Sequence, residues 1–310
     1  MISIVIATYN GERTIGRTLK SLCEIDRTPG SFEVIAVDNG SSDRTLEILN
    51  TFTTILPLRI FKQPKRGKNC ALNLAIPEAT GDLLLFTDDD IIADPQWLNA
   101  IEKCAKDHPD ASIFGGEIAP HWEKKPESWL LESIPIGVTY AITSTELETG
   151  PIHPGLIWGP NMMVRREVFD QGHRFNEDIG PNAGQYIMGS ETEFNTRMSK
   201  LGYTTWFCKD AKVEHIIRDF QTSPQWIIKR AYRFGRNKCV HDYSENPPQK
   251  RQLFGTINFP KWMLRRLATC YILGKINMIF GKNRKATQLL WDASFYHGYI
   301  NQAQQEKSGI

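Results

Sequence analysis

Residues 83–90 read LLLFTDDD, an apolar run that ends in three consecutive aspartates. A short apolar run of this kind is typical of a strand that is buried on both faces of a sheet. The chain before it alternates similar runs with apolar residues at helical spacing, which predicts β-α-β units and a mixed, mainly parallel α/β sheet flanked by helices. The expected strands are residues 3–7, 32–37, 58–61 and 83–86, and the expected helices are residues 14–22, 45–52 and 70–79.

The pattern after Asp90 is less regular. We expect further helices at residues 95–105, 191–201 and 224–238, and extended segments at residues 113–116 and 204–207. The apolar segment 260–280 is interrupted by charged residues, which favours a packing or interfacial helix over a membrane span. No uninterrupted apolar run is long enough to span a bilayer and no basic, cleavable leader is present, so the sequence predicts a cytoplasmic protein.

The cysteines give no sign of a disulfide framework. The six of them are widely spaced, without a C-x-x-C pair and without a histidine at the spacing of a zinc ligand; they are Cys23, Cys70, Cys104, Cys208, Cys239 and Cys270. Disulfide frameworks and zinc sites usually show closely spaced cysteines, or a cysteine with a histidine at a fixed spacing. We therefore expect reduced thiols that are mostly packed in the core.

The charge is distributed unevenly along a chain of otherwise ordinary globular composition, with 41% hydrophobic and 23% charged residues. Residues 219–310 carry 15 Lys and Arg against 5 Asp and Glu, a formal charge of +10, whereas residues 1–218 carry 22 against 30, a charge of −8. This asymmetry predicts an acidic catalytic part and a basic region that faces anionic lipid or a phosphorylated substrate. The acidic part would repel a nucleic-acid backbone, so no nucleic-acid partner is expected.

The three aspartates at residues 88–90 are the strongest chemical feature. Oxygen-rich clusters suit Mg²⁺ or Mn²⁺, which often bridge a carboxylate to substrate phosphates. A bound cation would also offset the repulsion between adjacent negative charges. The alternative is a helix N-terminus, where aspartates cap free N–H groups, and the cluster alone does not decide between the two.

Two further polar loops follow expected strands. Residues 37–43 read VDNGSSD and residues 7–10 read ATYN. At the carboxyl edge of a parallel sheet, Asp38 could contact the ribose or base of a nucleotide. The alternative is an ordinary strand-to-helix loop with Asp43 as the N-cap. Neither loop is a G-x-G-x-x-G or P-loop sequence, which argues against a dinucleotide cofactor or an ATPase.

These segments, together with GKNCALN at residues 67–73, resemble a family 2 glycosyltransferase with the GT-A fold. The resemblance continues through GPNMMVRR at 159–166, GSETEF at 189–194 and VEH at 213–215. It implies a GT-A domain over residues 1–218, with a nucleotide-sugar-binding half at 1–115 and an acceptor and catalytic half at 116–218. A basic, mostly helical region then covers residues 219–310.

The resemblance also implies site residues. The donor would be held by Thr8, Tyr9, Asn10, Glu12, Asp38, Gly67, Lys68, Asn73, Asp88 and Asp89. Asp88 and Asp90 match the D-x-D of the family, and with the late His215 they would hold Mn²⁺ or Mg²⁺, although a lone histidine is as often structural. The acceptor would meet Trp158, Gly159 and Asn161, and core packing is a comparable explanation for the tryptophan.

The catalytic base implied by the resemblance is Glu191. The family usually places a Glu-Asp pair here, whereas this chain has Ser190-Glu191, so the carboxylate is one methylene further from the backbone. Glu193 is the reserve candidate. Both residues begin an expected helix, where negative charge is also favourable without any catalytic role.

The expected function is therefore metal-dependent, inverting transfer of a sugar from a nucleotide-sugar, UDP-linked by preference, to a saccharide or lipid-linked acceptor in polysaccharide or glycoconjugate synthesis. The basic region would dock at an anionic membrane surface, and within it Arg230, Arg233 and Arg236 either bind a diphosphate or form a solvated face. The Gln-x-x-Arg-Trp sequence of processive members is absent, which favours a single transfer. The alternatives are a non-catalytic nucleotide-sugar or polysaccharide-binding partner and, more weakly, a sugar nucleotidyltransferase.

Overall fold

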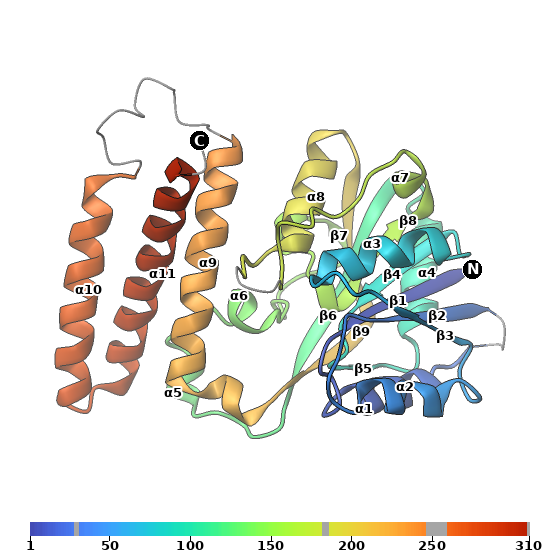
Figure 1. Cartoon of the computed structure of the whole chain (residues 1–310), viewed down its shortest axis with the longest axis horizontal. Helices are drawn as coiled ribbons and strands as arrows, with labels where there is room; N and C mark the ends of the chain where they lie inside the picture. The colour runs from blue at the N-terminus through green and yellow to red at the C-terminus, as the bar shows by residue number, and fades with distance from the viewer. Residues whose placement is uncertain (28–30, 182–185, 246–258, 309–310) are drawn as a thin grey trace. The chain divides into compact units, whose positions relative to one another are not determined.

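The computed structural model describes residues 1–27, 31–181, 186–245 and 259–308. Contacts within the chain divide it into two units (Figure 1). The first unit comprises Met1–His121, Tyr140–Gln185 and Ser190–Ile216, and the second comprises Trp122–Thr139, Tyr186–Gly189 and Ile217–Ile310. Among the described residues, no helix has both the length and the apolar character that crossing a bilayer requires.

The first unit is built on a parallel four-stranded core. Its strands lie in the order β3 (Leu58–Lys62), β2 (Phe32–Asp38), β1 (Ile2–Thr8) and β4 (Leu83–Thr87). In the register of this sheet Thr8 is opposite Asp38, so the loops that follow β1 and β2 leave the same edge side by side. The predicted α/β fold is confirmed for this part of the chain.

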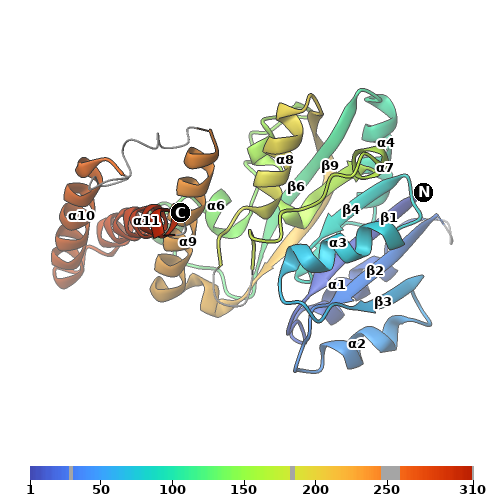
Figure 2. The ribbon, with the colours of Figure 1, turned by 45° about the horizontal axis from the view of Figure 1, so that its top comes forward.

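Alternation along the strands explains the covering helices. Ile2, Ile4 and Ile6 belong to one core cluster with residues of α1 (Ile15–Cys23). Val5 belongs to a second cluster with residues of α3 (Lys68–Glu78). Successive side chains of a strand point to opposite faces, so these apolar runs require a cover on both sides. Figure 2 shows α1 and α2 (Thr45–Phe52) on one face of the strands and α3 on the other.

Further strands extend the sheet beyond β4. They are β8 (Met162–Arg165), β6 (Ala111–Trp122), β9 (Thr204–Ile217) and β5 (Ile91–Ala93) in that order, with β7 (Gly150–Pro151) pairing with β9. The helices of this half are α4 (Trp97–Asp107), α7 (Arg166–Asp170) and α8 (Ser190–Lys200), and the short 3-10 turns are Pro154–Leu156 and Gly159–Asn161. Helix α6 (Ile136–Tyr140) belongs to the second unit except for its last residue. Strand β9 is much longer than the expected segment 204–207.

An aromatic cluster fixes α8 against β4. Phe194 of α8 lies 4.5 Å from Phe175 and 5.6 Å from Phe169, between ring centroids. Phe86 of β4 lies 5.1 Å from Phe175 and 5.6 Å from Phe169. Such offset and edge-to-face pairs bury large areas in a defined geometry. The cluster therefore sets the position of α8 relative to the aspartates that follow β4.

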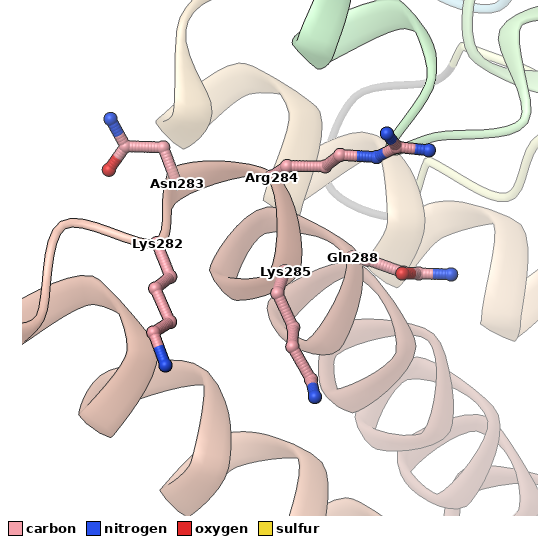
Figure 3. Close-up of a pocket in the computed structure, with 5 residues that line it drawn as sticks. All are labelled: Lys282, Asn283, Arg284, Lys285 and Gln288. Atoms are coloured by element: carbon pink, nitrogen blue, oxygen red, sulfur yellow. The ribbon is translucent and has the colours of Figure 1, made fainter.

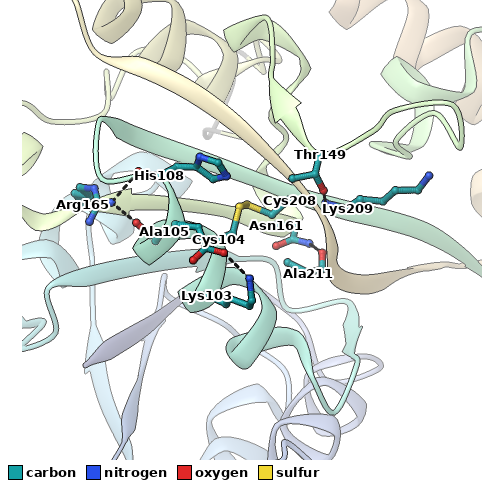
Figure 4. The surroundings of a disulfide bond; sticks show 11 residues. Lys103, Cys104, Ala105, His108, Thr149, Asn161, Arg165, Cys208, Lys209 and Ala211 are labelled. Carbon is teal, nitrogen blue, oxygen red and sulfur yellow. Dashed lines mark hydrogen bonds and ion pairs between the residues drawn. A yellow bond between two sulfur atoms is a disulfide. The ribbon is translucent and has the colours of Figure 1, made fainter.

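The structure pairs Cys104 of α4 with Cys208 of β9 in a disulfide, with a Cα–Cα distance of 6.2 Å (Figure 4). The expectation that all thiols are reduced is wrong for these two. Their separation of 104 residues gave no pattern to recognise, because packing of α4 against β9 is what brings them together. Nearby, the Arg165 guanidinium donates to the carbonyl oxygens of Ala105 and His108 at the end of α4, at 2.6 and 3.2 Å.

The second unit is dominated by three long helices, α9 (Pro224–Glu245), α10 (Lys261–Ile279) and α11 (Asn283–Ser308), and also contains α5 (Ser128–Leu131) and the 3-10 turn Asp219–Thr222. Helices α9 and α11 approach closely: a Cβ on Gly235 would lie 2.0 Å from the carbonyl oxygen of Phe295. Glycine at this position is required by the backbone of the neighbouring helix.

Candidate active site

The loops after β1 and β2 are locked to each other. Asn10 has a φ of 52°, and its backbone N–H donates to Ser41 Oγ at 2.9 Å. Its side-chain oxygen accepts from the N–H of Ser42 at 2.8 Å. Asparagine tolerates the left-handed region better than most residues, which suits it to this turn. The predicted residues Asn10 and Asp38 are thus part of one rigid edge, where Asp38 Oδ1 accepts from the N–H of Ser41 at 3.2 Å.

Asn39 organises the next loop, although the sequence reasoning did not single it out. Its amide donates to the carbonyl oxygens of Gln63 and Lys65 at 2.9 and 2.8 Å and accepts from the N–H of Gly67 at 2.8 Å. Gly67 has a φ of 137°, which disfavours any side chain. Asn39 therefore fixes the backbone just before Lys68, and its place in the VDNGSSD sequence was the available signal.

Tyr9 and Arg66 also meet at this edge. The Arg66 guanidinium lies 4.4 Å from the centroid of the Tyr9 ring, which is 47% exposed. A guanidinium over an aromatic face is a cation–π contact. Tyr9 is thereby held on the surface of the predicted donor site, and Arg66 is a second residue that the sequence reasoning missed.

Thr8 connects the first strand to the aspartate cluster. Its hydroxyl donates to Asp89 Oδ2. A Cβ on Gly11 would lie 2.4 Å from that same carboxylate oxygen and 2.7 Å from the Thr8 hydroxyl. The glycine therefore lets the loop after β1 pass directly beside Asp89. Of the three aspartates, Asp89 is the one joined to the predicted nucleotide-binding loop.

Lys68 joins two predicted site residues that are far apart in sequence. Its Nζ lies 2.5 Å from Asp88 Oδ1 and 2.7 Å from Glu191 Oε1. The three side chains are 17%, 25% and 14% exposed in the order Lys68, Asp88 and Glu191. An ion pair that is this shielded from water is much less screened than one at the surface. The structure thus brings the expected metal-binding aspartate, donor-binding lysine and catalytic glutamate together.

The charges in this cluster determine one another's ionisation. Burial alone would lower the pKa of Lys68, but Asp88 and Glu191 outweigh it and raise that pKa above its ordinary value. Burial alone would raise the pKa of Glu191, but the charge and hydrogen bond of Lys68 lower it overall. The pKa of Asp88 is raised, and burial is the largest cause. The Asp90 and Glu191 charges raise it further, while Lys68 opposes them. Glu191 is therefore ionised at neutral pH.

The position of Glu191 follows from the start of α8. Its second carboxylate oxygen accepts from the Ser190 hydroxyl at 2.8 Å. A Cβ on Gly159 would lie 2.5 Å from Glu191 Oε1, so the backbone of the predicted acceptor segment passes alongside the carboxylate. Glu193 instead lies 2.7 Å from Arg197 Nε, one helical turn further along α8. Of the two candidate bases, Glu191 is the one that the cluster contains.

Asp90 and His215 are brought together by strand pairing. Ile91 of β5 is opposite His215 of β9, and the His215 Nε2 atom lies 3.4 Å from Asp90 Oδ1. Its Nδ1 lies 2.6 Å from the carbonyl oxygen of Tyr140, which suits an Nδ1–H donor. Burial opposes protonation of the ring, but Asp90 outweighs it and raises the pKa of His215. The structure thus places this histidine beside Asp90, and its part in holding a metal ion stays a prediction.

The side chains around Asp88 and Asp90 can be compared with those that bind divalent ions in other proteins. Within the described ranges, no group of three or more His, Cys, Asp or Glu side chains is arranged to hold a metal ion by itself. Mg²⁺ and Mn²⁺ that serve phosphate substrates need only one or two protein carboxylates, because water and phosphate oxygens complete the shell. Asp88 and Asp90 fit that requirement. His215 is oriented by a carbonyl through its other nitrogen, as metal-ligating histidines usually are.

Three predicted contact residues have their side chains engaged elsewhere. Asn73 exchanges hydrogen bonds with the backbone of Phe175, both at 2.9 Å. Glu12 accepts from the N–H of Arg44 at 3.1 Å. Asn161 is fully buried, accepts from the Trp97 indole at 2.9 Å, and donates to the Glu117 and Ala211 carbonyl oxygens. These side chains shape the surrounding loops, and their contacts with donor or acceptor stay predictions.

Trp158, the remaining predicted acceptor contact, is half-buried and packs against the core cluster of the first unit. It directly precedes the turn Gly159–Asn161 and thereby anchors the start of that turn. Its packing is established, whereas a stacking contact with a sugar ring stays a prediction.

The fold and the edge of the sheet at which these residues meet define a GT-A glycosyltransferase. Residues 3–172 match the family described as glycosyl transferase family 2, and the chain belongs to this family. It is 23% identical over 248 residues to a glucosyl-dolichyl phosphate glucuronosyltransferase of Haloferax volcanii, covering 78% of this chain and 77% of that protein. It is 25% identical to the succinoglycan biosynthesis protein ExoM of Rhizobium meliloti, covering 76% and 73%.

Solved structures show the same fold. The mannosyltransferase PcManGT of Pyrobaculum calidifontis, in complex with GDP-Man and Mn²⁺, has a TM-score of 0.63 at 17% identity and covers 98% of this chain and 87% of its own. TarS 1–349 of S. aureus, in complex with UDP-GlcNAc, has a TM-score of 0.55 at 16% identity and covers 99% and 92%. At such identities these structures support the architecture.

The Gly159→Ala variant tests whether the predicted acceptor segment must lie against Glu191. The added methyl group would displace the carboxylate, and a misplacement of about 1 Å can reduce a rate on the order of 100-fold. We expect the catalytic rate constant for sugar transfer to fall while the melting temperature changes little. Gly155→Ala is the matched control, because its nearest neighbour is the flexible His153 ring at 3.2 Å. Unchanged turnover in Gly159→Ala would show that the close approach has no part in catalysis.

Proposed function

We propose that the protein transfers a sugar from a nucleotide-sugar, UDP-linked by preference, to a saccharide or lipid-linked acceptor, with inversion at the anomeric carbon and with Mn²⁺ or Mg²⁺. The reaction belongs to the synthesis of a cell-surface polysaccharide or glycoconjugate. The observation that carries the proposal is the position of the Glu191 carboxylate, which lies beside Gly159 and is linked through Lys68 to Asp88. Relatives named for glucuronosyl transfer and succinoglycan biosynthesis support it.

The residues have distinct parts in the proposed reaction. Glu191 accepts the proton of the acceptor hydroxyl as that oxygen attacks the anomeric carbon, because an alcohol is a weak nucleophile at neutral pH. Lys68 donates to the departing diphosphate, on which negative charge accumulates. Asp88 and Asp90, with His215, would hold the divalent ion, which supplies further positive charge at the diphosphate. A single displacement by the acceptor inverts the anomeric centre.

Replacing Glu191 by glutamine tests the proposed base. Glutamine keeps the size of the side chain but cannot take a proton, so we expect the turnover number to fall by about 10²–10⁴-fold with little change in donor affinity. Glu193→Gln is the control on the same helix, where the lost partner is Arg197, and it should retain most of its activity. Wild-type turnover in Glu191→Gln would exclude this residue as the base, whereas donor binding without any release of nucleoside diphosphate by the wild-type protein would favour the non-catalytic alternative.

Calorimetric titration of UDP tests the donor and the metal together. With Mn²⁺ present we expect binding that weakens about tenfold or more in EDTA, because a bridging ion between carboxylate and diphosphate is lost. The Asp90→Ala variant should bind UDP in Mn²⁺ no better than the wild type does in EDTA. GDP serves as the comparison, since solved neighbours bind either nucleotide-sugar. Equal UDP affinity in Mn²⁺ and EDTA would contradict the proposed metal site.

The second unit supports docking at an anionic membrane surface. Helix α10 buries only a narrow row that includes Met263, Cys270 and Gly274. Its large apolar side chains are mostly exposed; they are Trp262, Leu264, Tyr271, Ile272, Leu273, Ile276, Met278 and Ile279, with Phe280 directly after the helix. An apolar helix surface flanked by basic residues is typical of helices that lie in a membrane interface.

The sequence of α10 and its flanking residues carries charge of one sign. Residues 246–291 contain no Asp or Glu. A pocket of about 420 Å³ next to the start of α11 is lined by Lys282, Asn283, Arg284, Lys285 and Gln288. Figure 3 shows the side chains of Lys282 and Lys285 pointing to the same side and Arg284 pointing away from them. Each basic residue near an anionic bilayer contributes about 1 kcal/mol, so this composition favours an anionic lipid surface.

Sedimentation with lipid vesicles tests the docking surface. We expect binding to phosphatidylglycerol-containing vesicles that weakens with salt and is absent with phosphatidylcholine alone. Ile279→Glu should weaken it about tenfold or more, because Ile279 is 81% exposed and would lose its apolar burial in the interface. Ile55→Glu, at an isoleucine that is 66% exposed in the first unit, is the control. Equal binding to both vesicles, or a dimer dissociated by Ile279→Glu, would contradict membrane docking.

A further inference from the structure

Tyr186 lies between two arginines of α9. The Arg230 Nη1 atom donates to the Tyr186 hydroxyl at 3.2 Å. The Arg233 guanidinium lies 4.2 Å from the centroid of the Tyr186 ring. Trp226 supports Arg230 from the preceding turn of the helix, with 5.8 Å between the guanidinium and the indole ring. All four residues belong to the second unit. Two cationic groups are therefore gathered around one phenol.

These two guanidinium groups have no carboxylate partner in the described part of the chain. Among the described residues, neither Arg230 nor Arg233 forms an ion pair with Asp or Glu, whereas Lys238 on the same helix pairs with Asp242 at 2.5 Å. The segments outside the described ranges, residues 28–30, 182–185, 246–258 and 309–310, contain no Asp or Glu either. Those segments therefore cannot provide an Asp or Glu side chain that pairs with Arg230 or Arg233.

Burial raises the free energy of these two neighbouring guanidinium groups. Both arginine side chains are half-buried, in contrast to the exposed Lys229. The Nε atom of Arg230 is buried and has no hydrogen-bond partner among the residues that the structure describes. Burial is the main cause that lowers the pKa of Arg233, and the neighbouring Arg230 charge adds to it against the opposing effect of Tyr186. A buried donor without a partner and two adjacent like charges both cost free energy. A solvated basic face would have neither feature.

We propose that Tyr186, Arg230 and Arg233 form a binding site for a phosphate or diphosphate group, and that this group belongs to a lipid-linked acceptor. Planar guanidinium groups match phosphate oxygens in a bidentate geometry, and a phosphate dianion matches the charge of two arginines. The Tyr186 hydroxyl, which accepts from Arg230, has its own proton to donate to an anion. The assignment to an acceptor rests on the proposed function, whereas the anion site does not.

Titration with inorganic pyrophosphate in EDTA tests the anion site. We expect Arg230→Gln and Arg233→Gln to weaken binding about tenfold or more each, because each removes a charge-assisted contact. Tyr186→Phe keeps the ring under Arg233 and should lose less affinity. Lys229→Gln is the control, since it removes one exposed positive charge from the same helix. Equal affinity in all variants would overturn the site, and so would complete displacement of pyrophosphate by UDP, which would assign the anion to the donor site.

A second arm of the experiment distinguishes the source of the phosphate. A dodecyl diphosphate-linked sugar should compete with pyrophosphate in the wild type, whereas dodecyl maltoside should not. In transfer assays, Arg233→Gln should raise the KM for the diphosphate-linked acceptor and leave the catalytic rate constant nearly unchanged. Transfer to a saccharide without phosphate should be unaffected, which separates failure of this inference from failure of the proposed function. If only free pyrophosphate binds, the acceptor assignment is wrong.

Discussion

The contact of Lys68 with Asp88 and Glu191 is the constraint on which the rest of the first unit depends. One largely shielded positive charge stands between two carboxylates, and removing a partner from such a group leaves a charge that is costly to keep out of water. The surrounding structure serves to hold this lysine in place. Asn39 fixes the backbone before it, the aromatic cluster positions α8, and Gly159 leaves room beside Glu191.

The parallel half of the fold could be predicted because its signals are local. Strands β1, β2 and β4 are mainly apolar runs, β3 is more polar, and the expected limits of all four agree with the observed ones within two residues. The other half of the sheet depends on pairing between distant segments. Strand β5 has only three residues and exists through its pairing with β9, and the Cys104–Cys208 disulfide joins residues 104 positions apart. No local pattern specifies such contacts.

The sequence predicted which residues lie at the site, but it did not predict which of them contact a ligand and which support the loops. The resemblance to the family identified Asp88, Glu191 and Lys68, and the structure brings these three residues together. It did not show that the Asn161 side chain bonds to the Trp97 indole and to the carbonyl oxygens of Glu117 and Ala211. Polar residues at the carboxyl edge of a sheet either contact a ligand or support the loops that do, and both uses favour the same amino acids. Only the three-dimensional arrangement separates them.

The basic second unit shows the same ambiguity at the level of charge. A formal charge of +10 over residues 219–310 predicts an anionic partner, but it does not say where that partner binds. The structure shows these basic residues in two different environments. Around α10 the basic residues accompany exposed apolar side chains, a combination suited to a broad surface. On α9, Arg230 and Arg233 are half-buried around Tyr186, and enclosure of this kind suits a single compact anion. A lipid with a phosphorylated head group has both chemical features in one molecule.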